Sequence, residues 1–128
     1  MIPKFKAWDK KRKRVCKVIA IWFSAGSILL ENSPFRYERK LDEVELMKSS
    51  GLTDRNGIEI YEGYIVELKY PYDKRIKTKG IIVWNESKAC FGISMKETTE
   101  QFELYRITAE NYLTVIGNRF RNPELLEG

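Results

Sequence analysis

The chain has 128 residues, of which 43% are hydrophobic and 12% aromatic, a composition typical of a folded globular protein with one core or two small subdomains. Its 23 Lys and Arg against 18 Asp and Glu give a net charge of +5, which favours nucleic acid or an acidic partner without requiring either. There is no histidine, the side chain that most often transfers protons near neutral pH and the commonest metal ligand. This absence disfavours many classes of enzyme.

Two cysteines, Cys16 and Cys90, stand far apart in apolar surroundings. They cannot complete a four-thiolate zinc site, and without histidine a mixed Cys and His site is excluded. We therefore expect free, buried or half-buried thiols, with no metal and no other cofactor. The longest apolar run, at 18–23, is too short to cross a membrane, and no signal core follows the first charges, so a cytoplasmic protein without membrane contact is expected.

The first half of the chain is expected to form β-structure. A charged turn opened by Asp9 separates two apolar runs, which predicts a hairpin. In chain order, the expected elements are strands at 4–8, 15–23 and 28–31, a loop at 32–40, and a segment at 41–51 that fits a helix or an edge strand, its second half favouring a strand.

The second half is punctuated by turn residues. TDRNG at 53–57 predicts a hairpin turn, because Asp54 can start it and Asn56-Gly57 supplies positive φ. The elements expected after it are an alternating segment ended by Gly63, strands at 64–70, 80–86 and 91–96, a strand or helical turn at 97–107, a strand at 111–120 with a bulge or close approach at Gly117, and a helical turn at 122–126 with Asn122 as N-cap. Short strands from 62 to 120 predict a small closed or half-closed barrel.

Two basic runs are candidate nucleic-acid contacts. The first lies at the expected hairpin tip and comprises Lys10, Lys11, Arg12, Lys13 and Arg14. The second lies on an expected projecting loop at 71–80 and comprises Tyr72, Lys74, Arg75, Lys77 and Lys79. Cations neutralise phosphates, and aromatic faces beside them stack on bases. For the first run, a solvated tip that protects a sheet edge is the alternative.

A third mixture of aromatic and basic residues occurs at 32–40, where Phe35, Arg36, Tyr37, Arg39 and Lys40 interleave. Single-stranded bases stack on such faces while their phosphates pair with the cations. The alternative is that Phe35 folds back on the core.

Three segments resemble the landmarks of the YopX family of bacteriophage and prophage proteins. They read IPKFKAWD at 2–9, GLTDRNGIEIYEGYIVEL at 51–68 and VIGNRFRNPELL at 115–126. The resemblance implies an SH3-like β-barrel in the second half, an N-terminal β part, and a gene carried by a phage or prophage of Gram-positive bacteria. It supplies no catalytic residues. Family members typically read YEGD where this chain has Tyr at position 64, so any role of that Asp carboxylate is in doubt here.

The fold class expected is therefore mainly β with little helix. Residues 1–50 would form an N-terminal β-hairpin region, and residues 51–128 an SH3-like barrel on which that layer packs, so that the two together are expected to be one compact domain. The structural landmarks are Trp8, Gly51, Asp54, Gly57, Tyr61, Gly63, Gly117 and Asn118. Turn and bulge geometry alone can demand the glycines and Asp54, and Trp8 and Tyr61 are expected in or near the core.

Three functions fit this sequence. We expect a non-enzymatic binding module, with nucleic acid slightly favoured over a host or phage protein. The alternative is a protein-interaction or assembly factor that acts as a homo-oligomer through exposed strand edges. A metal-dependent enzyme built on Asp54, Glu59 and Glu62 is the least favoured.

Overall fold

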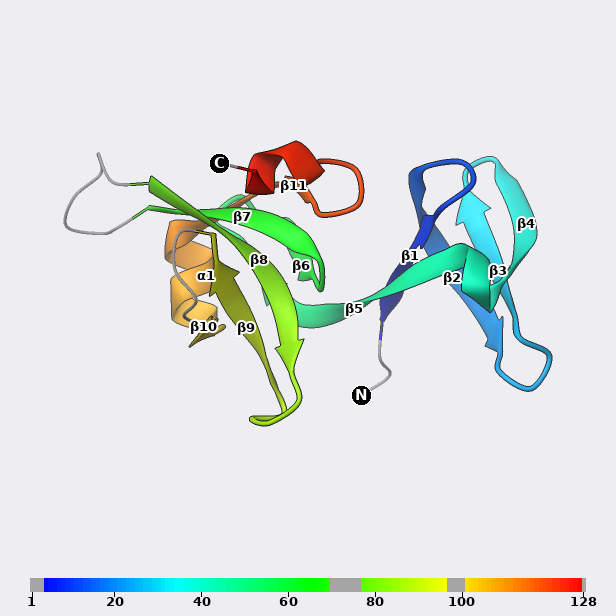
Figure 1. Ribbon diagram of the computed structural model, residues 1–128, viewed down its shortest axis with the longest axis horizontal. Coiled ribbons are helices and arrows are strands. Elements are labelled where there is room, and N and C mark those ends of the chain that lie inside the picture. Colours follow the sequence, from blue (N-terminus) through cyan, green and yellow to red (C-terminus); the bar gives the residue numbers. More distant parts are fainter. Residues whose placement is uncertain (1–3, 70–76, 97–100, 128) are drawn as a thin grey trace. The chain divides into compact units, whose positions relative to one another are not determined.

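The computed structural model describes residues 4–69, 77–96 and 101–127. The described chain is mainly β, with two antiparallel sheets and one α-helix (Figure 1). It divides into two compact units, Met1–Lys48 and Ser49–Gly128, and each is described by itself.

The first unit is an antiparallel sheet. It contains β1 (Phe5–Asp9), β2 (Arg14–Trp22), β3 (Ser27–Asn32), β4 (Phe35–Lys40), the 3-10 turn η1 (Leu41–Glu43) and the first part of β5 (Val44–Thr53). The strand order is β4-β3-β2-β1-β5. Its core is formed by Ala7, Cys16, Ile28, Leu30 and Val44.

The pairing of β2 with its neighbours β1 and β3 determines which residues lie next to the start of β2. Lys17 is opposite Lys6 of β1 and also opposite Glu31 of β3. Because antiparallel strands reverse direction at each turn, the β1–β2 turn and the β3–β4 turn lie at the same end of β2. Two turns that are about twenty residues apart in sequence are thereby brought together.

Strand β4 corrects the loop expected at 32–40. Only the turn at 33–34 is irregular, and Phe35–Lys40 pairs along its whole length with β3. The sequence does not predict this strand because its exposed positions other than Phe35 carry charged residues and only Tyr37 and Arg39 are partly buried, which leaves no apolar alternation to detect.

The second unit begins within β5, whose last residues pair with β6 (Glu59–Tyr61). A five-stranded sheet follows in the order β10-β9-β8-β7-β11. Its elements are β7 (Tyr64–Lys69), β8 (Lys77–Asn85), β9 (Cys90–Met95), β10 (Gln101–Glu103), α1 (Arg106–Tyr112) and β11 (Leu113–Asn118), followed by the 3-10 turn η2 (Pro123–Leu126). Fully buried core side chains include Ile60, Ile65, Val66, Ile82 and Leu113.

The sequence predicts a closed or half-closed barrel, and no closed barrel is found in the described ranges. In the described ranges, β10 pairs only with β9 and β11 only with β7, so the sheet has two free ends. The mainly β class with little helix is confirmed, whereas the SH3-like barrel is not.

Two local features of the second unit bear on the sequence interpretation. The register of β11 shifts between Val115 and Gly117, which confirms the expected bulge. The sequence predicts a strand or a helical turn at 97–107. The segment contains part of each, because β10 is a short strand and α1 begins at Arg106.

Candidate nucleic-acid interface

The turn that carries the first basic run is organised by the buried carboxylate of Asp9. Its Oδ1 accepts the backbone N–H groups of Lys11, at 3.0 Å, and of Arg12, at 3.3 Å. The backbone carbonyl of Asp9 accepts the N–H of Lys13 at 2.7 Å, and Lys13 adopts a φ of 55°. The basic run is therefore a tight turn, and the expected hairpin tip is confirmed.

Asp9 also anchors the ring of Tyr37 from β4. The Tyr37 hydroxyl donates to Asp9 Oδ2 at 2.6 Å and lies 3.3 Å from the Cys16 Sγ. Arg39 Nε lies 3.4 Å from the same carboxylate. The guanidinium groups of Arg12 and Arg39 lie 4.5 Å and 4.6 Å from the centre of the Tyr37 ring. Arg12 is therefore held against a ring that is itself hydrogen-bonded to a buried carboxylate.

The charge states of this cluster follow from these contacts. Burial by itself raises the pKa of Asp9, but hydrogen bonds from Tyr37 and two backbone N–H groups, together with the charge of Arg39, outweigh it, so that the pKa is lowered. Burial and the adjacent Asp9 and Cys16 raise the pKa of Tyr37. At neutral pH the cluster thus contains an ionised carboxylate and a neutral phenol.

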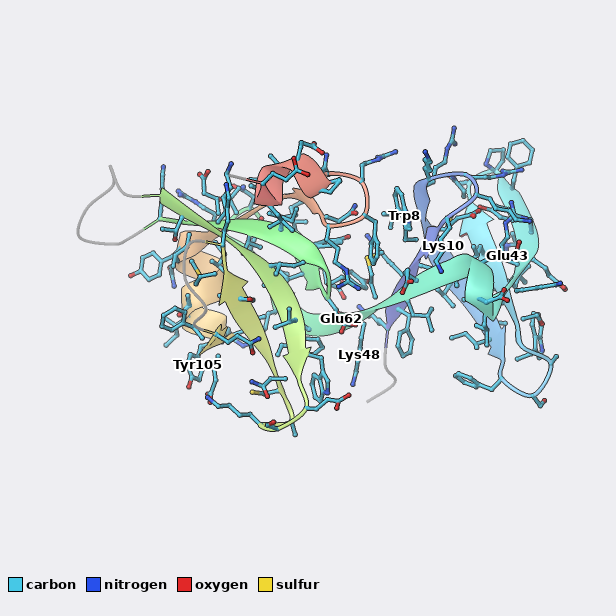
Figure 2. All side chains as sticks on the ribbon, in the orientation of Figure 1. Trp8, Lys10, Glu43, Lys48, Glu62 and Tyr105 are labelled. Carbon is cyan, nitrogen blue, oxygen red and sulfur yellow. The ribbon has the colours of Figure 1, made fainter. Side chains whose placement is uncertain are left out.

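The five cations of the first run differ in whether they form ion pairs. Lys10 Nζ lies 3.3 Å from a carboxylate oxygen of Glu45, and Lys11 Nζ lies 2.5 Å from one of Glu43. Lys10 also donates its backbone N–H to the Glu43 carbonyl, and the two residues lie side by side in Figure 2. Within the described residues, neither Lys13 nor Arg14 is ion-paired.

The two turns at this end of β2 enclose a pocket of about 430 Å³. Its lining residues are Arg12, Arg14, Asn32, Ser33 and Phe35. Phe35 is 65% exposed, so it does not fold back on the core as the alternative interpretation held. We call Arg12, Lys13, Arg14, Asn32, Ser33 and Phe35 the basic-aromatic end of the first unit. It joins two segments that the sequence singled out separately.

The second basic run is only partly described. Tyr72, Lys74 and Arg75 lie outside the described residues. Lys77 and Lys79 belong to β8, and the backbone of Lys79 lies opposite that of Glu67 in β7. The last residues of the expected loop at 71–80 are therefore part of a strand.

The landmark Asp54 closes its own turn. Its Oδ1 accepts the N–H groups of Asn56 and Ile58 at 2.8 Å and 2.9 Å, and its Oδ2 accepts that of Val115 at 2.8 Å. The side chain is 2% exposed. Asp54 therefore ties the β5–β6 turn to β11.

The other landmarks are also accounted for by structure. Gly51, Gly57 and Gly63 have φ values of 77°, 81° and 87°, which side chains with a Cβ rarely adopt. Trp8 and Tyr61 are buried, as expected.

The last landmark pair lies at the end of β11. A Cβ on Gly117 would lie 2.5 Å from Asn122 Oδ1, so any larger residue there would displace the Asn122 side chain. Asn118 Oδ1 accepts the N–H groups of Phe120 and Arg121 at 3.0 Å and 2.8 Å. Asn122 is the N-cap residue of η2, as expected, but its side chain accepts from the Asn118 N–H and makes no capping bond to η2.

Metal and membrane features are absent from the described part of the chain. There, no three Cys, Asp or Glu side chains are grouped so that they could hold a metal ion. No helix in the described ranges is long and apolar enough to span a bilayer. Both Cys16 and Cys90 are free thiols.

The fold and its basic-aromatic end define an all-β protein of two antiparallel units. The model of the YopX protein family matches residues 4–127, and the chain belongs to that family. This confirms the resemblance carried by the three sequence segments.

Two solved structures share the fold. Protein EF1440 from Enterococcus faecalis superposes with a TM-score of 0.71 at 23% identity, covering 99% of each chain. Protein yopX from Bacillus subtilis superposes with a TM-score of 0.61 at 19% identity, covering 98% of this chain and 96% of that one. No curated protein gives a significant match to this sequence.

Proposed function

We propose that this YopX-family protein is a non-enzymatic binding module that holds nucleic acid through the basic-aromatic end of its first unit. The observation that carries the proposal is the pocket in which Arg12 and Arg14 lie beside the exposed ring of Phe35. Cations that neutralise phosphates and an aromatic face that stacks on bases are the two elements of sequence-tolerant nucleic-acid binding.

The nearby carboxylates are placed so that they would not repel an anionic ligand. Among the described residues, no carboxylate lines the pocket. Asp9 is buried beneath Tyr37, and Glu31 is paired with Arg36 at 2.9 Å. An approaching phosphate would therefore meet the guanidinium groups without a neighbouring free carboxylate.

A phage or prophage origin and action in the bacterial cytoplasm, both expected from the sequence, belong to the same proposal. An SH3-like arrangement of the second unit is compatible with it but is not required, because the basic-aromatic end lies on the first unit.

The test is a fluorescence-anisotropy titration of labelled DNA and RNA with the whole protein at low salt. The key variant, Lys13→Ala/Arg14→Ala, removes two cations that have no ion-pair partner within the described residues. The matched control, Lys10→Ala/Lys11→Ala, removes two cations from the same turn that are already paired with Glu45 and Glu43. We expect binding about tenfold weaker for the key variant and nearly unchanged for the control.

Two outcomes would overturn the proposal. One is that wild type binds no DNA or RNA even at low salt. The other is that both double variants bind equally well, which would mean that net charge alone attracts the polymer. Light scattering on the same samples shows whether the binding species is one chain or an oligomer.

A further inference from the structure

We infer that the pocket of the basic-aromatic end holds an unpaired base against Phe35, so that the preferred ligand is a single strand. The inference rests on the proposed function and specifies its substrate class. Its first support is the position of Phe35 at the start of the edge strand β4, where the ring is 65% exposed. An exposed aromatic face beside two arginines is suited to stacking on a base.

The pocket is large enough to admit one base. A volume of about 430 Å³ lies in the range of small-molecule sites. In a duplex both faces of each base are covered by its neighbours and its pairing edge is occupied, so a base can enter only if it is unpaired.

The remaining lining residues offer hydrogen bonds for the edge of a base. Asn32 has an amide that donates and accepts, and Ser33 has a hydroxyl that does both. Asn32 and Phe35 are cross-strand partners at the β3–β4 turn. The ring that would stack and the amide that would bond to the base edge therefore come from the same turn.

The cluster beneath the pocket holds Arg12 in place for a phosphate. Arg12 packs on the Tyr37 ring, and Tyr37 is hydrogen-bonded to the buried Asp9. An arginine that is already held loses less conformational freedom when it binds a phosphate. Arg14 lines the same pocket and provides a second cation along the backbone of the strand.

The experiment compares three oligonucleotides of equal length by anisotropy with the whole protein: oligo-dT, a strand of abasic sugars that keeps every phosphate, and a blunt duplex. We expect oligo-dT to bind about tenfold more tightly than the other two, because one stacked base contributes roughly that factor. Equal binding of all three would overturn the inference.

Variants at Phe35 assign the effect to the pocket. Phe35→Leu keeps an apolar side chain but loses the stacking face, and Phe35→Trp keeps the face. We expect Phe35→Leu to weaken oligo-dT binding about tenfold while leaving the abasic strand unchanged, and Phe35→Trp to bind like wild type. If Phe35→Leu binds oligo-dT as wild type does, the base does not lie on this ring. Circular dichroism checks that each variant is folded, as expected for an exposed position.

Failure of this inference can be told apart from failure of the proposed function. If duplex and single strand bind equally and both depend on Lys13 and Arg14, the module binds nucleic acid but the pocket does not select a base. If polyglutamate displaces oligo-dT at equal charge concentration, neither claim holds, because the surface is then only a cation patch.

Discussion

Three buried polar side chains, Asp9, Asp54 and Asn118, act alike although they lie far apart in sequence. In each, one side-chain oxygen accepts two backbone N–H groups from the residues that follow, so that the side chain closes the turn at the end of a strand. Burial gives these bonds their importance, because a backbone N–H group without a partner away from water is costly.

Asp54→Ala removes three such bonds at once, including the one to the Val115 N–H group of β11. We expect the free energy of unfolding to fall by about 2–4 kcal/mol, because several backbone donors lose a charged acceptor. Urea unfolding measures it. Asp54→Asn, which keeps one carbonyl acceptor, should lose less, and equal stability of Asp54→Ala and wild type would contradict this role.

At the scale of elements, the β1–β2 turn and β4 are coupled through Asp9. Its carboxylate bonds to the turn backbone and to Tyr37 of β4, while Arg39 of β4 lies beside it. The turn that presents Arg12, Lys13 and Arg14 is thus held by the neighbouring strand. Protonation of this one carboxyl group should loosen both elements together.

The acid dependence of stability follows from the lowered pKa of Asp9, whose ordinary value is 3.8. The folded protein binds this proton more weakly than the unfolded chain does, so the stability contributed by the carboxylate is fully present above that value and is lost as pH falls through the lower folded pKa. We expect Asp9→Asn to unfold with about 2 kcal/mol less free energy at pH 7, the difference from wild type shrinking below pH 3.8.

Urea unfolding between pH 7 and pH 2, followed by tryptophan fluorescence, measures this difference. The control is Asp42→Asn, which removes an exposed carboxylate of η1 on the same unit. A gap between Asp9→Asn and wild type that stays constant over the whole pH range would show that the carboxylate contributes by shape and not by charge.

The elements that sequence could predict were those bounded by turn chemistry. The turns at Asp9 and Gly57 are predicted correctly because short-range backbone geometry demands these residues, although Gly57 alone, and not Asn56, has a positive φ. The helix α1 was found only in part, since its sequence RITAENY contains β-branched and aromatic residues and its N-cap makes no side-chain bond.

The candidate pocket could not be predicted as a unit. Its two halves were noted separately, but their meeting depends on the register in which Lys17 lies between Lys6 and Glu31. Register is set by the hydrophobic patterns of the paired strands together with the geometry of the turns between them, which no single short stretch of sequence reveals. The sequence also predicts a loop where β4 lies, and Phe35 is positioned by the pairing of β4 with β3.

At the scale of the whole molecule, the net charge of +5 is a small excess spread over 23 cations and 18 anions. In the β1–β2 turn, Lys10 and Lys11 are paired with glutamates, whereas Lys13 and Arg14, which belong to the basic-aromatic end, are not paired within the described ranges. The salt dependence of binding counts the cations that meet phosphates and is therefore more informative than the net charge.

If Arg12, Lys13 and Arg14 contact three phosphates of a single strand, the logarithm of the binding constant should fall with the logarithm of salt concentration with a slope of about −2. For Lys13→Ala/Arg14→Ala we expect about −0.7, since one contact is left. Anisotropy titrations at several salt concentrations measure the slope. A wild-type slope of about −5 or steeper would contradict the assignment, because further cations would then contribute.

The two free thiols are distributed one to each unit. Cys16 is 1% exposed in the core of the first unit, and Cys90 is partly buried at the start of β9 in the second. An alkylating reagent modifies a thiol only when it reaches solvent, so the labelling rate of the buried Cys16 reports how often the first unit opens, and the partly exposed Cys90 serves as the reference. Mass spectrometry of the labelled peptides can therefore measure the opening of the first unit against a thiol of the same chain, without any engineered probe.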